Sequence, residues 1–76
     1  MKSYEVVREI FNNCAKVWRI DTHFTDEIET DDLVGTMTEW FKGDLPKYEI
    51  ETLDDGTLLY TFNDVPLPER FYFTEF

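Results

Sequence analysis

The aromatic content of the chain is the feature that most limits how it can fold. Seven Phe, four Tyr and two Trp occur within 76 residues that contain a single cysteine. A lone cysteine cannot form an internal disulfide, and one Cys with one His cannot supply the ligands of a structural zinc site. A domain of this length buries only about 60% of the surface of its unfolded chain. Its stability therefore depends on aromatic packing, to which self-association can add.

Negative charge restricts the possible partners. Seventeen acidic and seven basic residues give a formal net charge of −10. Residues 1–20 carry four bases and two acids, whereas residues 21–76 carry three bases and fifteen acids. A nucleic-acid binder neutralises phosphates with clustered Lys and Arg, and anionic lipid attracts the same residues. We therefore expect no direct nucleic-acid binding and no membrane binding, but a protein partner with a basic surface.

The distribution of apolar residues indicates a location. No segment approaches the roughly 18 consecutive apolar residues of a transmembrane helix, and the first residues lack the apolar core of a signal peptide. A single unpaired cysteine is typical of a reducing compartment. We therefore expect a cytoplasmic protein, with residues 1–76 forming one small acidic domain.

Two segments show the periodicity of a helix. The apolar side chains of residues 3–14 recur at i, i+3, i+4 and i+7, at Val7, Ile10, Phe11 and Cys14. A second helix is predicted from Thr30 as N-cap to Lys42, and Gly43 follows as the residue that ends it. The expected buried face of this helix comprises Leu33, Met37, Trp40 and Phe41.

Alternation of apolar and polar residues predicts the strands. Residues 16–24 alternate with a period of two, and the acidic residues 25–29 are then expected to form a loop. Residues 69–76 are predicted as a last strand with aromatic side chains on both faces. The predicted order is α-β-α-β-β-β. This is an α+β domain with a four-stranded, mostly antiparallel sheet and two helices packed on one face.

Between these elements, residues 48–53 and 57–62 are predicted to form a hairpin, and alternation decides its turn. A two-residue turn at Asp55 and Gly56 would place Tyr60 and Phe62 on the face of the glutamates of the first strand. A three-residue loop, 54–56, instead gathers the apolar side chains on one face, namely Tyr48, Ile50, Leu58, Tyr60 and Phe62. We therefore predict the longer loop, with Gly56 in the left-handed conformation of a bulge turn.

The densest acidic run, residues 21–32, contains six acids and no Lys or Arg. We take it as the candidate binding surface, with binding residues Asp21, His23, Asp26, Glu27, Glu29, Asp31 and Asp32. Carboxylates with one imidazole could also hold a divalent ion or supply an acid and a base. The run lacks the central Gly of a calcium-binding EF-hand loop, and a solvated acidic loop explains it as well. We expect no metal and no cofactor.

Two further features bear on function. Cys14 lies on the apolar stripe of the first predicted helix, so burial is expected rather than catalysis, and we assign no catalytic residue. The aromatic side chains of the last strand would form an interface if that strand lies at the sheet edge, either in a homodimer or by extending the sheet of a partner, and these are Phe71, Tyr72, Phe73 and Phe76. Coverage of one face by a helix is the alternative.

These observations favour a small acidic interaction module, an accessory subunit or small inhibitor, that binds a basic surface of a protein partner. One alternative is a nucleic-acid mimic that occupies the basic groove of a nucleic-acid-binding protein, since the composition is similar to that of small inhibitors of this kind. Another is a homodimeric small enzyme or metal-dependent protein that uses residues 21–32, although a chain this short rarely forms a pocket alone.

Overall fold

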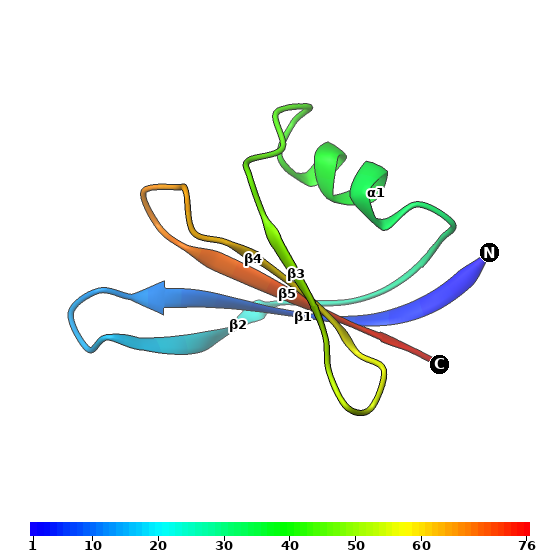
Figure 1. The fold of residues 1–76 in the computed structure, drawn as a ribbon, viewed down its shortest axis with the longest axis horizontal. Helices are drawn as coiled ribbons and strands as arrows, with labels where there is room; N and C mark the ends of the chain where they lie inside the picture. The colour runs from blue at the N-terminus through cyan, green and yellow to red at the C-terminus, as the bar shows by residue number, and fades with distance from the viewer.

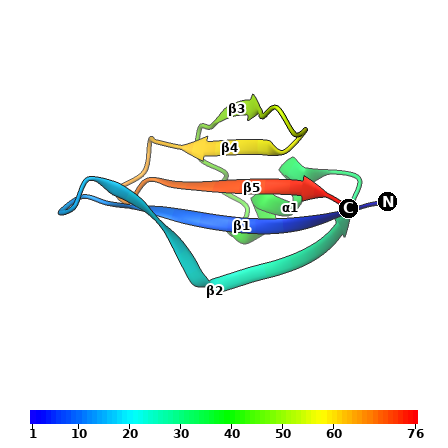
Figure 2. The same cartoon turned by 90° about the horizontal axis from the view of Figure 1, so that it is seen from below.

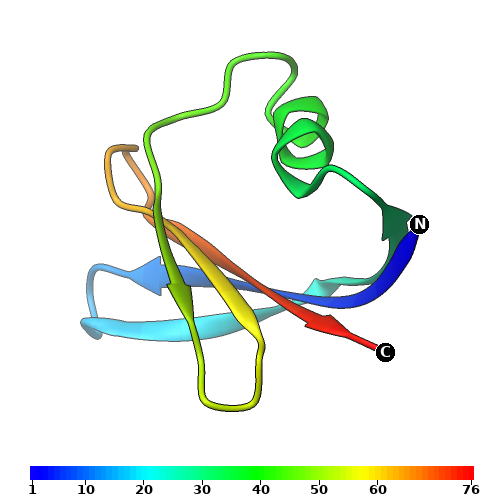
Figure 3. The same cartoon turned by 45° about the vertical axis from the view of Figure 1, so that its right-hand side comes forward.

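The protein is a five-stranded antiparallel sheet with one helix. The computed structural model describes residues 1–21 and 27–76 in full, and residues 22–26 only as part of a strand. The elements are β1 (Lys2–Asn12), β2 (Val17–Thr30), α1 (Leu33–Trp40), β3 (Glu49–Thr52), β4 (Leu58–Phe62) and β5 (Glu69–Glu75). The strand order is β2-β1-β5-β4-β3, and every neighbouring pair is antiparallel. The α1 helix lies against one face of the sheet (Figure 1, Figure 3).

The expected α+β arrangement of two helices and four strands is therefore wrong. Within the described chain there is one helix, and the order is β-β-α-β-β-β. The segment predicted as the first helix is the strand β1. Its residues also alternate with a period of two, and several are β-branched, which favours a strand. Pairing with β2 on one side and β5 on the other decides between the two patterns.

The turn between β1 and β2 corrects the expectation for Cys14. The side-chain oxygen of Asn12 accepts hydrogen bonds from the backbone N–H groups of Cys14 and Ala15, at 2.9 and 3.1 Å. This side-chain turn closes the hairpin, and Lys16 takes the left-handed conformation with φ +57°. Cys14 is exposed in the turn instead of buried in a helix.

The strand predicted from residue 16 exists, but it is longer than expected. β2 continues to Thr30, so residues 27–29, expected in a loop, are paired with β1. Glu27 lies opposite Glu5, and Glu29 lies opposite Ser3. The acidic composition of this segment did not prevent strand formation, because β1 supplies backbone partners to residues 27–30.

The hairpin of β3 and β4 follows the predicted register. Ile50 is opposite Tyr60 and Thr52 is opposite Leu58, as the three-residue loop requires. Gly56 is left-handed with φ +89°. The Asp55 carboxylate accepts a hydrogen bond from the backbone N–H of Thr57, which fixes the loop and lowers the pKa of Asp55.

The α1 helix is also confirmed, although its N-cap is shifted. Asp32, rather than Thr30, is the N-cap, and its carboxylate accepts a hydrogen bond from the Gly35 N–H at 3.0 Å. Thr30 Oγ1 in turn accepts a bond from the Asp32 N–H at 2.9 Å. A side chain at position 35 would collide with the Asp32 carboxylate, which explains a glycine inside this short helix.

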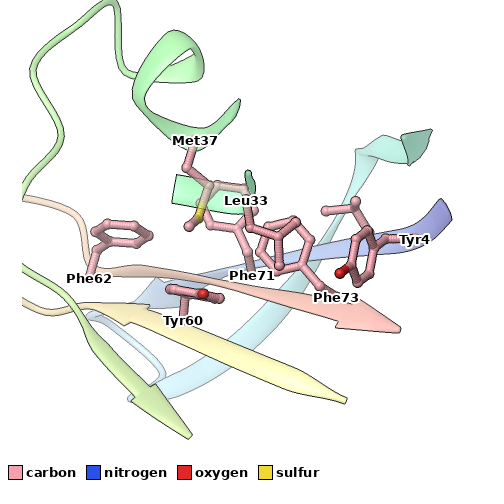
Figure 4. Packing of buried hydrophobic residues seen from close by; sticks show 8 residues of the cluster. Tyr4, Leu33, Met37, Tyr60, Phe62, Phe71 and Phe73 are labelled. Atoms are coloured by element: carbon pink, nitrogen blue, oxygen red, sulfur yellow. The ribbon is translucent and has the colours of Figure 1, made fainter. Parts of the chain in front are cut away.

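The core lies between α1 and the sheet (Figure 4). Met37 is fully buried, and Leu33 is nearly so. They face a layer of strand side chains that comprises Tyr4, Val6, Tyr60, Phe62, Phe71 and Phe73. At the end of the helix, its last residue Trp40 packs on Phe71 and Phe73, and the C-cap residue Phe41 packs on Phe62, with ring centroids 4.9–6.1 Å apart. The aromatic side chains therefore form the core, as the composition predicted.

On the face of the sheet that α1 covers, the salt bridges of one arginine connect three strands. The Arg8 guanidinium of β1 donates to Asp21 of β2 and to Glu69 of β5, both at 2.9 Å. The two carboxylate side chains are only 15% and 13% exposed. Charges this far out of water stabilise the fold only while their partner is present.

We predict that the space at Gly35 is coupled to the Asp32 cap. Gly35→Ala should stabilise an Asp32→Ala chain by about 1 kcal/mol, the usual gain of Ala over Gly in a helix. In the native chain it should give no gain, because the displaced carboxylate loses its capping bond, which contributes a similar free energy. Urea unfolding of the four chains measures this coupling. Equal gains in both backgrounds would contradict it.

We also predict that Arg8→Met lowers the free energy of unfolding by about 2 kcal/mol, because it leaves two largely buried carboxylates without their cation. The matched control is Lys2→Met, which removes an ion pair with Glu75 whose side chains are 63% and 56% exposed. That change should cost less than about 0.5 kcal/mol. Chemical denaturation measures the loss of unfolding free energy in both variants. Similar losses would contradict the prediction, because the Arg8 salt bridges would then stabilise the fold no more than an exposed ion pair does.

Candidate functional site

The face of the sheet opposite α1 is the candidate site, and Figure 2 looks onto it. We call it the open face. In the register of the strands, its described members are Glu5, Val7, Glu9 and Phe11 of β1, Trp18, Ile20, Glu27 and Glu29 of β2, Arg70, Tyr72 and Thr74 of β5, Leu59 and Thr61 of β4, and Glu49 and Glu51 of β3.

An arginine that lies over two aromatic rings occupies the centre of this face. The Arg70 guanidinium carbon is 4.3 Å from the ring centre of Trp18 and 5.5 Å from that of Tyr72. Its Nε donates a hydrogen bond of 2.6 Å to the Glu9 carboxylate, so the charge is both stacked and paired. Phe11 extends the arrangement by edge contact with Trp18 at 5.3 Å. The open face therefore has an ordered, partly apolar centre.

Tyr72 belongs to this centre. Burial raises the pKa of its hydroxyl, and a hydrogen bond to the Glu9 carboxylate raises that pKa further, while the nearby Arg70 charge opposes the rise. Tyr72 also borders Val7 and Leu59 in one row across the sheet. The protonated hydroxyl donates to the Glu9 carboxylate, and this bond is lost when the hydroxyl ionises.

Exposed carboxylates flank the centre on both sides. Glu5 and Glu27 lie opposite each other on β1 and β2, with Glu29 beyond them, and all three are exposed. On the other side, Glu49 and Glu51 of β3 are exposed as well. Strand spacing of about 4.8 Å puts the flanks on β2 and β3 about 19 Å apart. Among the described strand residues, Arg70 is the basic side chain that the register places on this face.

Three members of the predicted acidic site make contacts within the chain. Asp21 points to the other face and binds Arg8 at 2.9 Å. Asp32 caps α1. Asp31 lies 3.5 Å from the N-terminal amine. Two others, His23 and Asp26, lie outside the residues that are fully described. Glu27 and Glu29 are left as exposed members of the open face.

The predicted aromatic interface is divided between the two faces. Phe71 and Phe73 are buried in the core under α1, at 2% and 0% exposure. Tyr72 is half-buried on the open face, and Phe76 is 68% exposed beyond the end of β5. β5 is not an edge strand, because it pairs with β1 on one side and β4 on the other. The premise of an interface through this strand therefore does not hold.

Several residues of the open face were not recognised from the sequence. Glu49 and Glu51 could have been identified from the sequence. The predicted hairpin register already placed them on the other face of the sheet from the apolar side chains of their strand. Glu5 and Glu9 were missed because their segment was taken for a helix. The stacking of Arg70 on Trp18 had no signal, because the two residues are distant in sequence and meet only through β1.

Across residues 1–21 and 27–76, no group of three His, Cys, Asp or Glu side chains is arranged to hold a metal ion. None of the helices in the described chain is long and apolar enough to cross a membrane. The comparisons add no assignment: no family model matches the sequence, and no curated protein or solved structure is significantly similar.

We predict that the ionisation of Tyr72 makes the fold sensitive to alkaline pH. A raised pKa in the folded state means that the contribution to stability is complete below the unfolded value of about 10 and is lost as pH rises through the folded value. Tyr60, whose pKa is raised by burial, acts in the same direction. Between about pH 9 and pH 11, Tyr72→Phe should lose less unfolding free energy than the native chain. Identical losses in urea titrations would refute this assignment.

Proposed function

We propose that the protein is a small interaction module whose open face binds a basic surface of a protein partner. The observation that carries this proposal is the register of the sheet, which gathers exposed carboxylates from β1, β2 and β3 on the same uncovered face. Acidic loops alone would be solvated surface. Here the carboxylates border an ordered aromatic centre, so charge and apolar contact are available together.

Electrostatic attraction and apolar contact contribute to different steps of such binding. Long-range attraction to Lys and Arg steers the partner and speeds association, and this effect weakens as salt rises. The half-buried rings and Val7 then supply short-range contact, which slows dissociation. The net charge of −10 strengthens the steering. A cytoplasmic location fits this function and the exposed free thiol of Cys14.

The proposal is tested by affinity capture from the cells that make the protein, at low and at moderate ionic strength. The native chain is compared with Glu27→Lys/Glu29→Lys, which reverses charge on the open face. We expect at least one partner with a basic surface to be captured about tenfold less by this variant, and less by the native chain as salt rises.

Glu39→Lys/Asp44→Lys is the matched control. It makes the same change in net charge at exposed positions in and after α1, on the covered side of the sheet. Equal loss of capture in both variants would show that only overall charge matters, and would refute a specific role for the open face. If the captured partners are nucleic-acid-binding proteins, competition with their nucleic acid distinguishes the mimic alternative.

A further inference from the structure

The open face has the dimensions of a site for a helix. Its central row runs from Val7 through Tyr72 and Leu59 to Glu51, and the next row runs from Glu9 through Arg70 to Glu49. The half-buried rings of Phe11, Trp18 and Tyr72 and the side chain of Val7 still present apolar surface. The flanks of carboxylates on β2 and β3 are separated by about four strand spacings, or 19 Å.

We propose that this face binds one amphipathic helix of a basic partner, an inference that rests on the proposed function. An α-helix with its side chains is about 10–12 Å wide. When its axis runs along the strands, its apolar stripe contacts Val7 and Tyr72, and Lys or Arg side chains from its two sides reach outward by several ångströms. They then meet Glu27 and Glu29 on one side and Glu49 and Glu51 on the other.

Charge complementarity selects this occupant over the others. A second copy of the chain would bring two sets of exposed glutamates together, and like charges facing each other oppose association. Anionic lipid and nucleic acid are repelled by the same groups. The opposite face already carries α1, whose apolar side packs on the sheet. A basic helix on the open face would complete a three-layer arrangement of helix, sheet and helix.

The Arg70 stack is compatible with a cationic ligand. Its guanidinium is paired with Glu9 and lies over two rings, so the positive charge at the centre of the face is already neutralised. The specific requirement is therefore a stripe of apolar residues at i, i+3, i+4 and i+7, with Lys or Arg on both of its borders.

The test uses two synthetic peptides of about 18 residues, long enough to form several helical turns. Both contain the same number of Leu and Lys residues. In one, Leu forms a continuous helical stripe, and in the other the order is shuffled so that no stripe exists. Isothermal titration measures their dissociation constants, and backbone amide shifts in NMR spectra locate the bound peptide on the chain.

We expect the striped peptide to bind at least about tenfold more tightly than the shuffled one, with shifts concentrated in β1, β5 and β4. Glu27→Lys/Glu29→Lys and Glu49→Lys/Glu51→Lys should each weaken it about tenfold, while Glu39→Lys/Asp44→Lys changes it much less. Val7→Thr keeps the shape of the side chain and replaces one methyl group with a hydroxyl, so it should weaken binding of the striped peptide several-fold without unfolding the chain.

The experiment distinguishes a failure of the helix site from a failure of the proposed function. If both peptides bind equally and the flank variants weaken both, the acidic binding face stands and the helix site is refuted. If the flank variants behave like the control variant, both the helix site and the proposed function of the open face are refuted. Binding of the striped peptide that depends on one flank alone also overturns the helix site, because that geometry requires both.

Discussion

The pairing of β1 with β5 is the contact on which the rest of the structure depends. It joins the two ends of the chain in the middle of the sheet, with Val6 opposite Phe73 and Arg8 opposite Phe71. Without it, the N-terminal hairpin and the C-terminal meander would be two small sheets, neither of which could bury its apolar face. Because these partners are more than sixty residues apart in sequence, loop closure precedes the gain from packing. Such a topology is expected to fold slowly for its size.

The same pairing explains why the charge is displayed as it is. The covered face takes most of the large aromatic side chains, and Arg8 holds Asp21 and Glu69 there, whereas the glutamates at alternate positions of β1, β2 and β3 lie on the opposite side. Glu5 of β1 and Glu51 of β3 lie on one surface only because β5 and β4 stand between them in register. The acidic surface is thus a product of sheet topology, and not of one acidic loop.

The elements that were predicted correctly are those decided by local rules. The turn at Gly56 follows from the need to place apolar residues of two adjacent strands on one face, and α1 follows from its cap and its apolar spacing. Residues 3–14 satisfied two periodicities at once, and the partner that decides between them, β5, is far away in the sequence. For the site, the acids of residues 21–32 formed one run in the sequence. Burial beside Arg8 removes Asp21 from it, and alternation leaves Glu27 and Glu29 facing outward.

The two faces of β5 also limit how this sequence can vary. Phe71 and Phe73 point to the core, whereas Arg70 and Tyr72 point to the open face. An inserted or deleted residue inside β5 would exchange these sets, placing a guanidinium under α1 and phenyl rings in solvent. The same change in the connector 63–68 would leave the alternation intact, because loops there can absorb the difference. Related sequences should therefore keep the length of this strand while the preceding loop varies, which offers a marker by which distant relatives can be recognised.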